Sequence, residues 1–272
     1  THSLNLVMFF ATLAFILKPL KNIGAQMLQL SETKGALTHS FEILSCNDAY
    51  NHQKTSQQPQ TNQHVSNYGS IKQVSCGFQK KTVVHLNNFN IIPGTAMAIV
   101  GPNGSGKSTI LRTLAGLLTP IHWNANIDWL ELSNKTTMVS QYPFLFNNSL
   151  LDNIIYGLPD STNWSEQDIW NILEQVHIDE QIKSLPELLQ TNFKTLGANL
   201  SGGQIQKLVI ARALIRKKPI ILMDEATSAI DPNSEYEISS NLIKQIKQSN
   251  QSIISVTHRA ETLKLYDHVV HI

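Results

Sequence analysis

A glycine-rich stretch, GPNGSGKS at residues 101–108, constrains this chain more than any other part of its sequence. It follows the apolar run Ala96–Val100 and precedes a helical pattern over residues 108–117. A glycine loop between a strand and a helix can bring several backbone N–H groups to phosphate oxygens, and the helix points its positive end at the same anion. The alternative is a glycine-rich turn that only begins a helix. The form GxxxxGK[ST] and its setting favour a phosphate-binding loop.

Two side chains of this loop have specific expected tasks. Lys107 is placed to reach the outer phosphates of a nucleotide, and the hydroxyl of Ser108 is placed to bind Mg²⁺. The residues of the loop that we expect to bind the nucleotide are Gly101, Pro102, Asn103, Gly104, Ser105, Gly106, Lys107, Ser108 and Thr109.

Apolar runs alternate with helical patterns over residues 71–272. The runs Ala96–Val100, 220–223 and Ser252–Val256 are short, as is typical of strands that are buried on both faces of a parallel sheet. Between the last two runs, residues 233–249 carry Ile238, Leu242 and Ile246 at helical spacing. We therefore predict an α/β domain with a parallel sheet.

A pair of carboxylates ends one of these apolar runs, in the sequence IILMDE at residues 220–225. Ligands of open parallel sheets bind at the carboxyl ends of the strands. Asp224 is therefore placed to hold Mg²⁺, and Glu225 is placed to polarise an attacking water. The alternative is two surface acids at a solvated strand end, which the nearby phosphate loop makes the weaker interpretation.

The sequence LSGGQ at residues 200–204 has two interpretations. Ser201 and Gln204 fit a capping box for a helix that runs through Lys207, Ile210 and Leu214. The same helix start could also bind a second anion.

Taken together, residues 71–272 resemble the ATP-binding-cassette (ABC) ATPases. The resemblance rests on GPNGSGKST, on LSGGQ with IARAL after it, on IILMDEATSAID, and on VTH at residues 256–258. It implies a P-loop NTPase fold with a parallel sheet core and a helical subdomain, and it implies that ATP and Mg²⁺ are bound and ATP is hydrolysed.

The resemblance also implies roles for single residues. Gln141 is similar to the glutamine that contacts Mg²⁺ and water, and His258 is similar to the switch histidine on the γ-phosphate. Asp231 is similar to a residue that crosses the dimer interface, although it also fits a helix N-cap before Pro232. Phe78 is similar to the aromatic residue that stacks on adenine, where the family usually has Tyr; the alternative is a core strand residue.

In this family, the LSGGQ segment of one subunit closes over ATP that is held by the phosphate loop of another. Hydrolysis is therefore expected to require a dimer. The residues expected to act in trans are Ser201, Gly203 and Gln204, and Gly202 between them is also expected to bind the nucleotide.

The N-terminal part differs in composition. Residues 4–17 are almost wholly apolar but too few to span a bilayer, and Lys18 and Lys21 follow them. We interpret residues 1–44 as the end of a last transmembrane helix and its helical extension, and residues 45–70 as a polar linker. A signal-peptide core and a buried soluble helix are the alternatives for residues 4–17.

Residues 10–44 and 145–157 also resemble exporters of the lipid-flippase and type I secretion kinds, which carry a transmembrane domain before the ATPase. We expect one half of a homodimeric or heterodimeric exporter in a cell membrane, with its ATPase domain in the cytoplasm and an unidentified substrate. Because the chain begins at Thr1 and ends at Ile272 within an expected strand, we expect a fragment of a longer polypeptide.

Two other functions remain open from the sequence. One is a soluble ATPase of the same superfamily in DNA maintenance or translation, and the other is a regulatory module that does not hydrolyse ATP. The net charge of +1 gives no basic field for nucleic acid, which disfavours a nucleic-acid partner. The intact Glu225 and His258 disfavour a module without hydrolysis.

Overall fold

The protein is described from a computed structural model, which covers residues 68–78, 81–158, 164–193 and 200–272, with the backbone alone at Phe78. The chain divides into two compact units, Thr1–Gln63 and His64–Ile272, and every described residue lies in the second. The apolar run at 4–17 and the helix expected up to residue 44 lie outside the described residues. Within the described part, no helix has the length and apolar character that crossing a bilayer requires.

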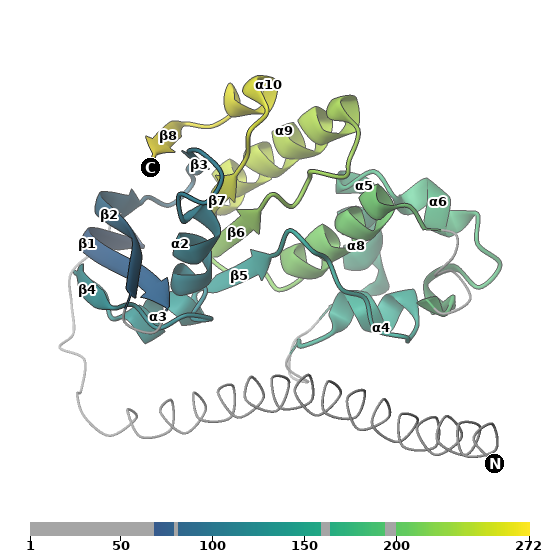
Figure 1. Ribbon diagram of the computed structural model, residues 1–272. Coiled ribbons are helices and arrows are strands. Elements are labelled where there is room, and N and C mark those ends of the chain that lie inside the picture. The colour runs from purple at the N-terminus through teal and green to yellow at the C-terminus, as the bar shows by residue number, and fades with distance from the viewer. Residues whose placement is uncertain (1–67, 79–80, 159–163, 194–199) are drawn as a thin grey trace, which may run out of the picture. The chain divides into compact units, whose positions relative to one another are not determined.

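A five-stranded sheet forms the centre of this unit, and every pair of neighbouring strands is parallel (Figure 1). The strand order is β5-β6-β7-β3-β8. The prediction of a parallel α/β sheet is therefore confirmed. The strands are β3 (Ala96–Val100), β5 (Thr136–Val139), β6 (Ile220–Asp224), β7 (Ser252–Val256) and β8 (His268–His271).

Strand β6 shows why such runs contain apolar residues at every position. Ile220 and Leu222 belong to one cluster of buried side chains, whereas Ile221 and Met223 belong to another. Because successive side chains of a strand point to opposite faces, both faces of the sheet are covered. Strand β6 ends one residue later than the apolar run, since Asp224 still pairs with Val256 of β7.

A second, antiparallel sheet has the order β2-β1-β4 and was not predicted from the sequence. Its strands are β1 (Gly69–Phe78), β2 (Lys81–Ile91) and β4 (His122–Ala125). The buried side chains of β1 and β2 lie in one cluster with Ile110 and Leu111 of α2 (Lys107–Leu114) and with Leu222 of β6. The helix that follows the phosphate loop is thus packed in the cluster that joins the two sheets.

The remaining helices gather mostly around the other cluster. They are α3 (Trp129–Asn134), α4 (Leu150–Ile155), α5 (Glu166–Gln175), α6 (Asp179–Lys183), the 3-10 helix η1 (Leu188–Gln190), α8 (Gly202–Leu214), α9 (Pro232–Ser249) and α10 (Ala260–Leu263). Buried residues of α4, α5, α6 and α8 pack with those of α9 and with Ile221 of β6.

Two helix boundaries differ from the sequence expectation. Helix α2 ends at Leu114 rather than near residue 117, because Gly116 has a φ of 78°, a left-handed conformation that stops a helix. Helix α9 begins at Pro232, one residue earlier than expected, with Asp231 as its N-cap. Ile238, Leu242 and Ile246 are all buried, as the helical spacing predicts.

Candidate functional site

The phosphate loop leads from β3 into the first turn of α2. The N-cap of α2 is Gly106, with a φ of 98° and no side chain to accept a hydrogen bond, and the first turn contains no acidic residue. The N–H groups that begin a helix have no partner within it, so those of α2 are available to an external anion. Lys107 is buried, and its Nζ donates to the carbonyl oxygens of Gly101 and Pro102 at 2.9 and 2.8 Å.

Two glycines of the loop are required by close approaches. A Cβ atom at Gly106 would lie 2.7 Å from Val84 of β2, and one at Gly101 would lie 2.4 Å from the carbonyl oxygen of Ile272. Real Cβ atoms do not come this close, so both positions need glycine. Together with Gln141 and Glu225, most residues of the loop line an open hollow of about 360 Å³.

Asp224 ends β6 beneath this loop. Its Oδ1 accepts a hydrogen bond from the Ser108 hydroxyl at 2.8 Å, and its side chain is almost fully buried. Burial raises the pKa of Asp224, whereas the hydrogen bond from Ser108 and the positive charge of Arg112 act in the opposite direction. The two residues predicted to bind Mg²⁺ through a carboxylate and a hydroxyl therefore touch each other.

Glu225 holds the next position and contacts two other predicted residues. Its Oε2 accepts from Nε2 of Gln141 at 2.7 Å, and its Oε1 lies 3.3 Å from Nε2 of His258. The backbone of Glu225 has a φ of 46°, a left-handed conformation that costs a residue other than glycine roughly 1–3 kcal/mol. Such strain at a carboxylate with two aligned partners is typical of a functional position.

The residues around Asp224 have the chemistry that Mg²⁺ needs. Mg²⁺ takes oxygen ligands and commonly uses only one or two protein groups beside phosphates and waters. Asp224 and Ser108 offer a carboxylate and a hydroxyl. The side-chain N–H of Gln141 donates to Glu225, so the amide oxygen of Gln141 is the atom that could bind a cation. In the described part of the chain, no cluster of three or more His, Cys, Asp or Glu residues forms a separate metal site.

The LSGGQ segment forms the capping box that its sequence predicts. Ser201 is the N-cap of α8: its Oγ accepts from the N–H of Gln204, and the Gln204 side chain accepts from the N–H of Ser201. Ser201 and Gly202 are exposed. Within the described residues, no hydrogen bond joins this helix start to the phosphate loop of the same chain.

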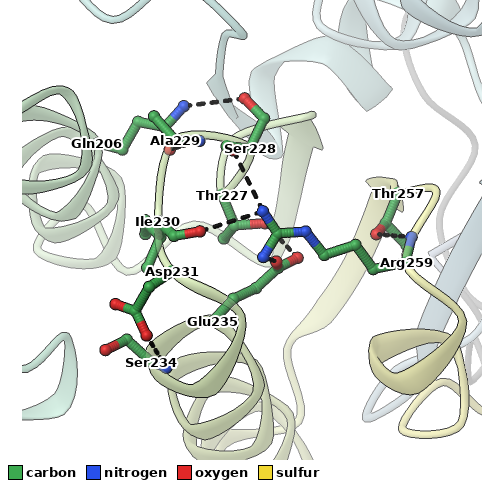
Figure 2. Close-up of polar contacts among 10 residues, drawn as sticks. All are labelled: Gln206, Thr227, Ser228, Ala229, Ile230, Asp231, Ser234, Glu235, Thr257 and Arg259. Atoms are coloured by element: carbon green, nitrogen blue, oxygen red, sulfur yellow. Dashed lines mark hydrogen bonds and ion pairs between the residues drawn. The ribbon is translucent and has the colours of Figure 1, made fainter.

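Asp231 is the N-cap of α9, where its Oδ1 accepts from the N–H of Ser234 at 3.0 Å. Figure 2 shows it at the end of residues 228–231, which we call the linking segment because they lead from Glu225 toward α9. The hydrogen bond from the Ser234 backbone lowers the pKa of Asp231. The capping interpretation of Asp231 is therefore confirmed, and its role in a dimer stays a prediction.

Sequence reasoning missed several residues around the site. Val83 of β2 lines the hollow at the phosphate loop. Gln206 and Arg259 both contact the linking segment. The only available signals were that Gln206 lies two residues after LSGGQ and that Arg259 directly follows His258. Phe78 ends β1, but its side chain lies outside the description, as does Lys194, so the adenine-stacking prediction stays open.

Comparisons with known proteins agree with this geometry. A family model described as "ABC transporter" matches residues 84–228, which include the phosphate loop, LSGGQ and the acidic pair. A solved structure of a bacterial Atm1-family ABC exporter with ATP bound superimposes with a TM-score of 0.67 at 27% sequence identity. The match covers 85% of this chain and 42% of that one.

Two curated relatives illustrate the sequence similarity. The mitochondrial iron-sulfur clusters transporter ATM1 of Candida albicans is 35% identical over 210 residues, which is 74% of this chain and 28% of that protein. The ATP-dependent lipid A-core flippase of Haemophilus influenzae is 32% identical over 275 residues, which is 96% of this chain and 45% of that protein. The chain thus spans less than half the length of these relatives.

Proposed function

Since the chain belongs to the ABC transporter family and contains the ATPase domain of that family, we propose that it hydrolyses ATP with Mg²⁺. The observation that carries this proposal is the position of Glu225. Its carboxylate lies between Gln141 and His258, one residue after the buried Asp224 and at the edge of the hollow lined by the phosphate loop.

In the proposed reaction, a water attacks the γ-phosphorus, the bond to the bridging oxygen breaks, and ADP and phosphate leave. Glu225 orients this water and accepts its proton. Gln141 and His258 fix the two oxygens of that carboxylate in place. The loop N–H groups and Lys107 stabilise the charge that develops on the phosphate oxygens.

Magnesium ion neutralises phosphate charge in reactions of this kind. We propose that Ser108, Asp224 and Gln141 hold it here. Their oxygens form a set that suits a hard cation, and the Asp224 carboxylate already accepts a hydrogen bond from the Ser108 hydroxyl. Lys107 would exchange its present bonds to the carbonyls of Gly101 and Pro102 for bonds to phosphate oxygens.

We further propose that two copies act together. The signature residues Ser201, Gly202, Gly203 and Gln204 form a helix start whose first two residues are exposed. In the described part, this helix start has no hydrogen bond to the phosphate loop of its own chain. An exposed helix N-terminus can bind an anion presented by another molecule. Each ATP would then be held between the loop of one copy and the signature of the other.

We propose that hydrolysis drives export across a membrane by a dimer of half-transporters, with an unidentified lipid, peptide or drug-like substrate. The similarity to the flippase and ATM1 relatives supports this direction of transport. It disfavours a soluble ATPase of the same superfamily. The membrane location and a cytoplasmic ATPase domain belong to the same proposal, and recovery of the whole protein from cytosol without detergent would contradict them.

The direct test of hydrolysis is Glu225→Gln in the whole protein. We expect phosphate release to fall by roughly 10²–10⁴ while ATP still binds, because the amide cannot take the proton from water. The variant should accumulate as an ATP-bound dimer in size-exclusion chromatography. Glu174→Gln, on the exposed face of α5, is a matched control that should keep the wild-type rate. Unchanged phosphate release in Glu225→Gln would remove Glu225 from this role.

A further inference from the structure

The linking segment, residues 228–231, is held on one side by Arg259, the residue directly after His258 (Figure 2). One terminal nitrogen of Arg259, Nη2, donates to the carbonyl oxygens of Ser228 at 3.3 Å and Ile230 at 3.1 Å. The other, Nη1, forms an ion pair with the carboxylate of Glu235 in the first turn of α9. One guanidinium therefore fixes two backbone carbonyls and a side chain at once, which requires its planar fork.

Glu235, the carboxylate that pairs with Arg259, is itself held in a fixed position. Its side chain is 2% exposed, and its other oxygen accepts from the Thr227 hydroxyl at 2.8 Å. A buried carboxylate with both oxygens occupied has little freedom to move. Arg259 is therefore anchored at Glu235, and the two carbonyls are held relative to that anchor.

The opposite side of the segment is held by α8. Gln206 is buried; its Nε2 donates to the Ser228 hydroxyl at 3.2 Å, and its Oε1 accepts from the N–H of Ala229 at 2.9 Å. The start of α8 also touches the segment directly, because a Cβ atom at Gly203 would lie 2.9 Å from the carbonyl oxygen of Ala229. The helix that begins at LSGGQ thus packs on the segment by both side chain and backbone.

These contacts place the linking segment between two functional parts of the same chain. On one side lie His258 and Glu225, which act on the ATP held by this chain, and on the other lies the signature, which faces the ATP of a second copy. We infer that Arg259 and Gln206 are positioning residues for ATP hydrolysis, which hold residues 228–231 so that the two half-sites of one chain keep a fixed relation. This inference rests on the proposed function.

Two variants test it in the whole protein. Arg259→Lys keeps the positive charge beside Glu235 but cannot bond the carboxylate and both carbonyls together. Gln206→Met keeps the length of the side chain and removes both of its hydrogen bonds to the segment. Neither residue lines the hollow at the phosphate loop. We therefore expect kcat to fall about tenfold in each variant while the KM for ATP stays within about twofold of wild type.

Lys247→Met is the matched control, because it removes another ion pair of α9, from Lys247 Nζ to Asp267 Oδ1 at 2.7 Å, away from the linking segment. It should lower the melting temperature slightly and leave kcat unchanged. Nucleotide affinity is measured separately with a non-hydrolysable ATP analogue, and melting temperature is recorded for every variant.

A fall in kcat at constant analogue affinity, in both test variants and not in the control, supports the inference. Wild-type kcat in Arg259→Lys and Gln206→Met overturns it, provided that Glu225→Gln is inactive in the same assay. A loss of kcat that only follows melting temperature across all three variants also overturns it, since that result indicates a purely structural role. If Glu225→Gln keeps the wild-type rate, the proposed function itself fails.

Discussion

Helices α2 and α8 both have glycine at their start, as the N-cap in α2 and in the first turn in α8, but the two N-termini differ in structure. Helix α2 has Gly106 as its cap, with no side-chain partner, and buried charged groups surround its start. Helix α8 has a complete capping box from Ser201 and Gln204. Its start carries no charge, and Ser201 and Gly202 are exposed.

This difference indicates a division of tasks. The start of α2 leaves its N–H groups for a ligand, and Lys107, Asp224 and Glu225 around it supply the charges for chemistry. At the start of α8, the capping box already pairs the backbone N–H groups of Ser201 and Gln204. This helix start therefore offers only the weakly positive end of the helix to an anion from outside. Changes at α2 should therefore remove both binding and chemistry, whereas changes at α8 should act only when a second copy is present.

Among changes at these two helix starts, the largest effect is expected from Lys107→Ala. The variant loses the ammonium group that is placed to bind the outer phosphates, and loss of a single such donor commonly lowers rates by about 10²–10³. Weaker ATP binding should add to this loss. Phosphate release and binding of a fluorescent ATP analogue measure the two effects. Lys264→Ala, at an exposed ion pair with Glu261, is the control that should behave as wild type. Full activity of Lys107→Ala would contradict the assignment of the phosphate loop.

A smaller but more selective effect is expected from Gly202→Asp. A Cβ atom fits at this position, because its nearest neighbour would be the Cβ of Ala229 at 3.5 Å. The new carboxylate would repel the phosphates of an ATP bound to the other copy, which at a distance of about 4 Å amounts to several kcal/mol and a loss of roughly 10² in rate.

The control for that variant is Gly202→Asn, which has the same shape without the charge and should stay within about threefold of wild type. An acid in the first turn stabilises a helix by about 0.3–1 kcal/mol, so the melting temperature of Gly202→Asp should not fall. Equal rates for the Asp and Asn variants would show that no anion approaches this helix start.

The smallest effect concerns the stability of the α2 side without nucleotide. Because burial raises the pKa of Asp224, the folded chain binds its proton more tightly than the unfolded chain. The stabilisation that the protonated Asp224 carboxyl gives the folded state is therefore present below the pKa that Asp224 has in the unfolded chain. It is lost as the pH rises through the higher pKa that Asp224 has in the folded chain. Asp224→Asn, which has no carboxyl proton to lose, should be more stable than wild type at neutral pH.

Urea denaturation at pH 5 and pH 7.5 tests this expectation. The stability advantage of Asp224→Asn should be larger at pH 7.5 than at pH 5, although the variant hydrolyses ATP poorly. A variant that is less stable than wild type at pH 7.5 would show that the buried carboxylate stabilises the fold rather than serving a ligand.

The central strands and the helix starts could be predicted from the sequence because local signals determine them. The bounds of β3 and β7 match the apolar runs, since burial on both faces leaves little room for polar residues. Ser201 caps α8 as its box predicts. Strand β4 could not be predicted, because the sequence HWNA is half exposed and forms a strand only by pairing with β1.

The contacts within the site join residues that are far apart in the chain, so the sequence alone could not predict which side chains meet there. Gln141 and Glu225 are far apart in the chain, and only the neighbouring positions of β5 and β6 bring them together. That Gln141 and Glu225 act at the same site could be expected from the family resemblance but not from their spacing in the sequence. The bonds of Arg259 and Gln206 to residues 228–231 have no counterpart in any motif, because they depend on how α8, α9 and the end of β7 pack.

The most direct test of the two-copy site is a mixing experiment with Lys107→Ala and Gly202→Asp protein. In a heterodimer of these variants, one composite site carries both defects and the other carries none. Because half of the dimers in an equal random mixture are heterodimers, we expect two inactive preparations to regain up to about a quarter of the wild-type rate when mixed and allowed to exchange. A mixture that exchanges subunits and stays inactive would contradict a site shared between two copies.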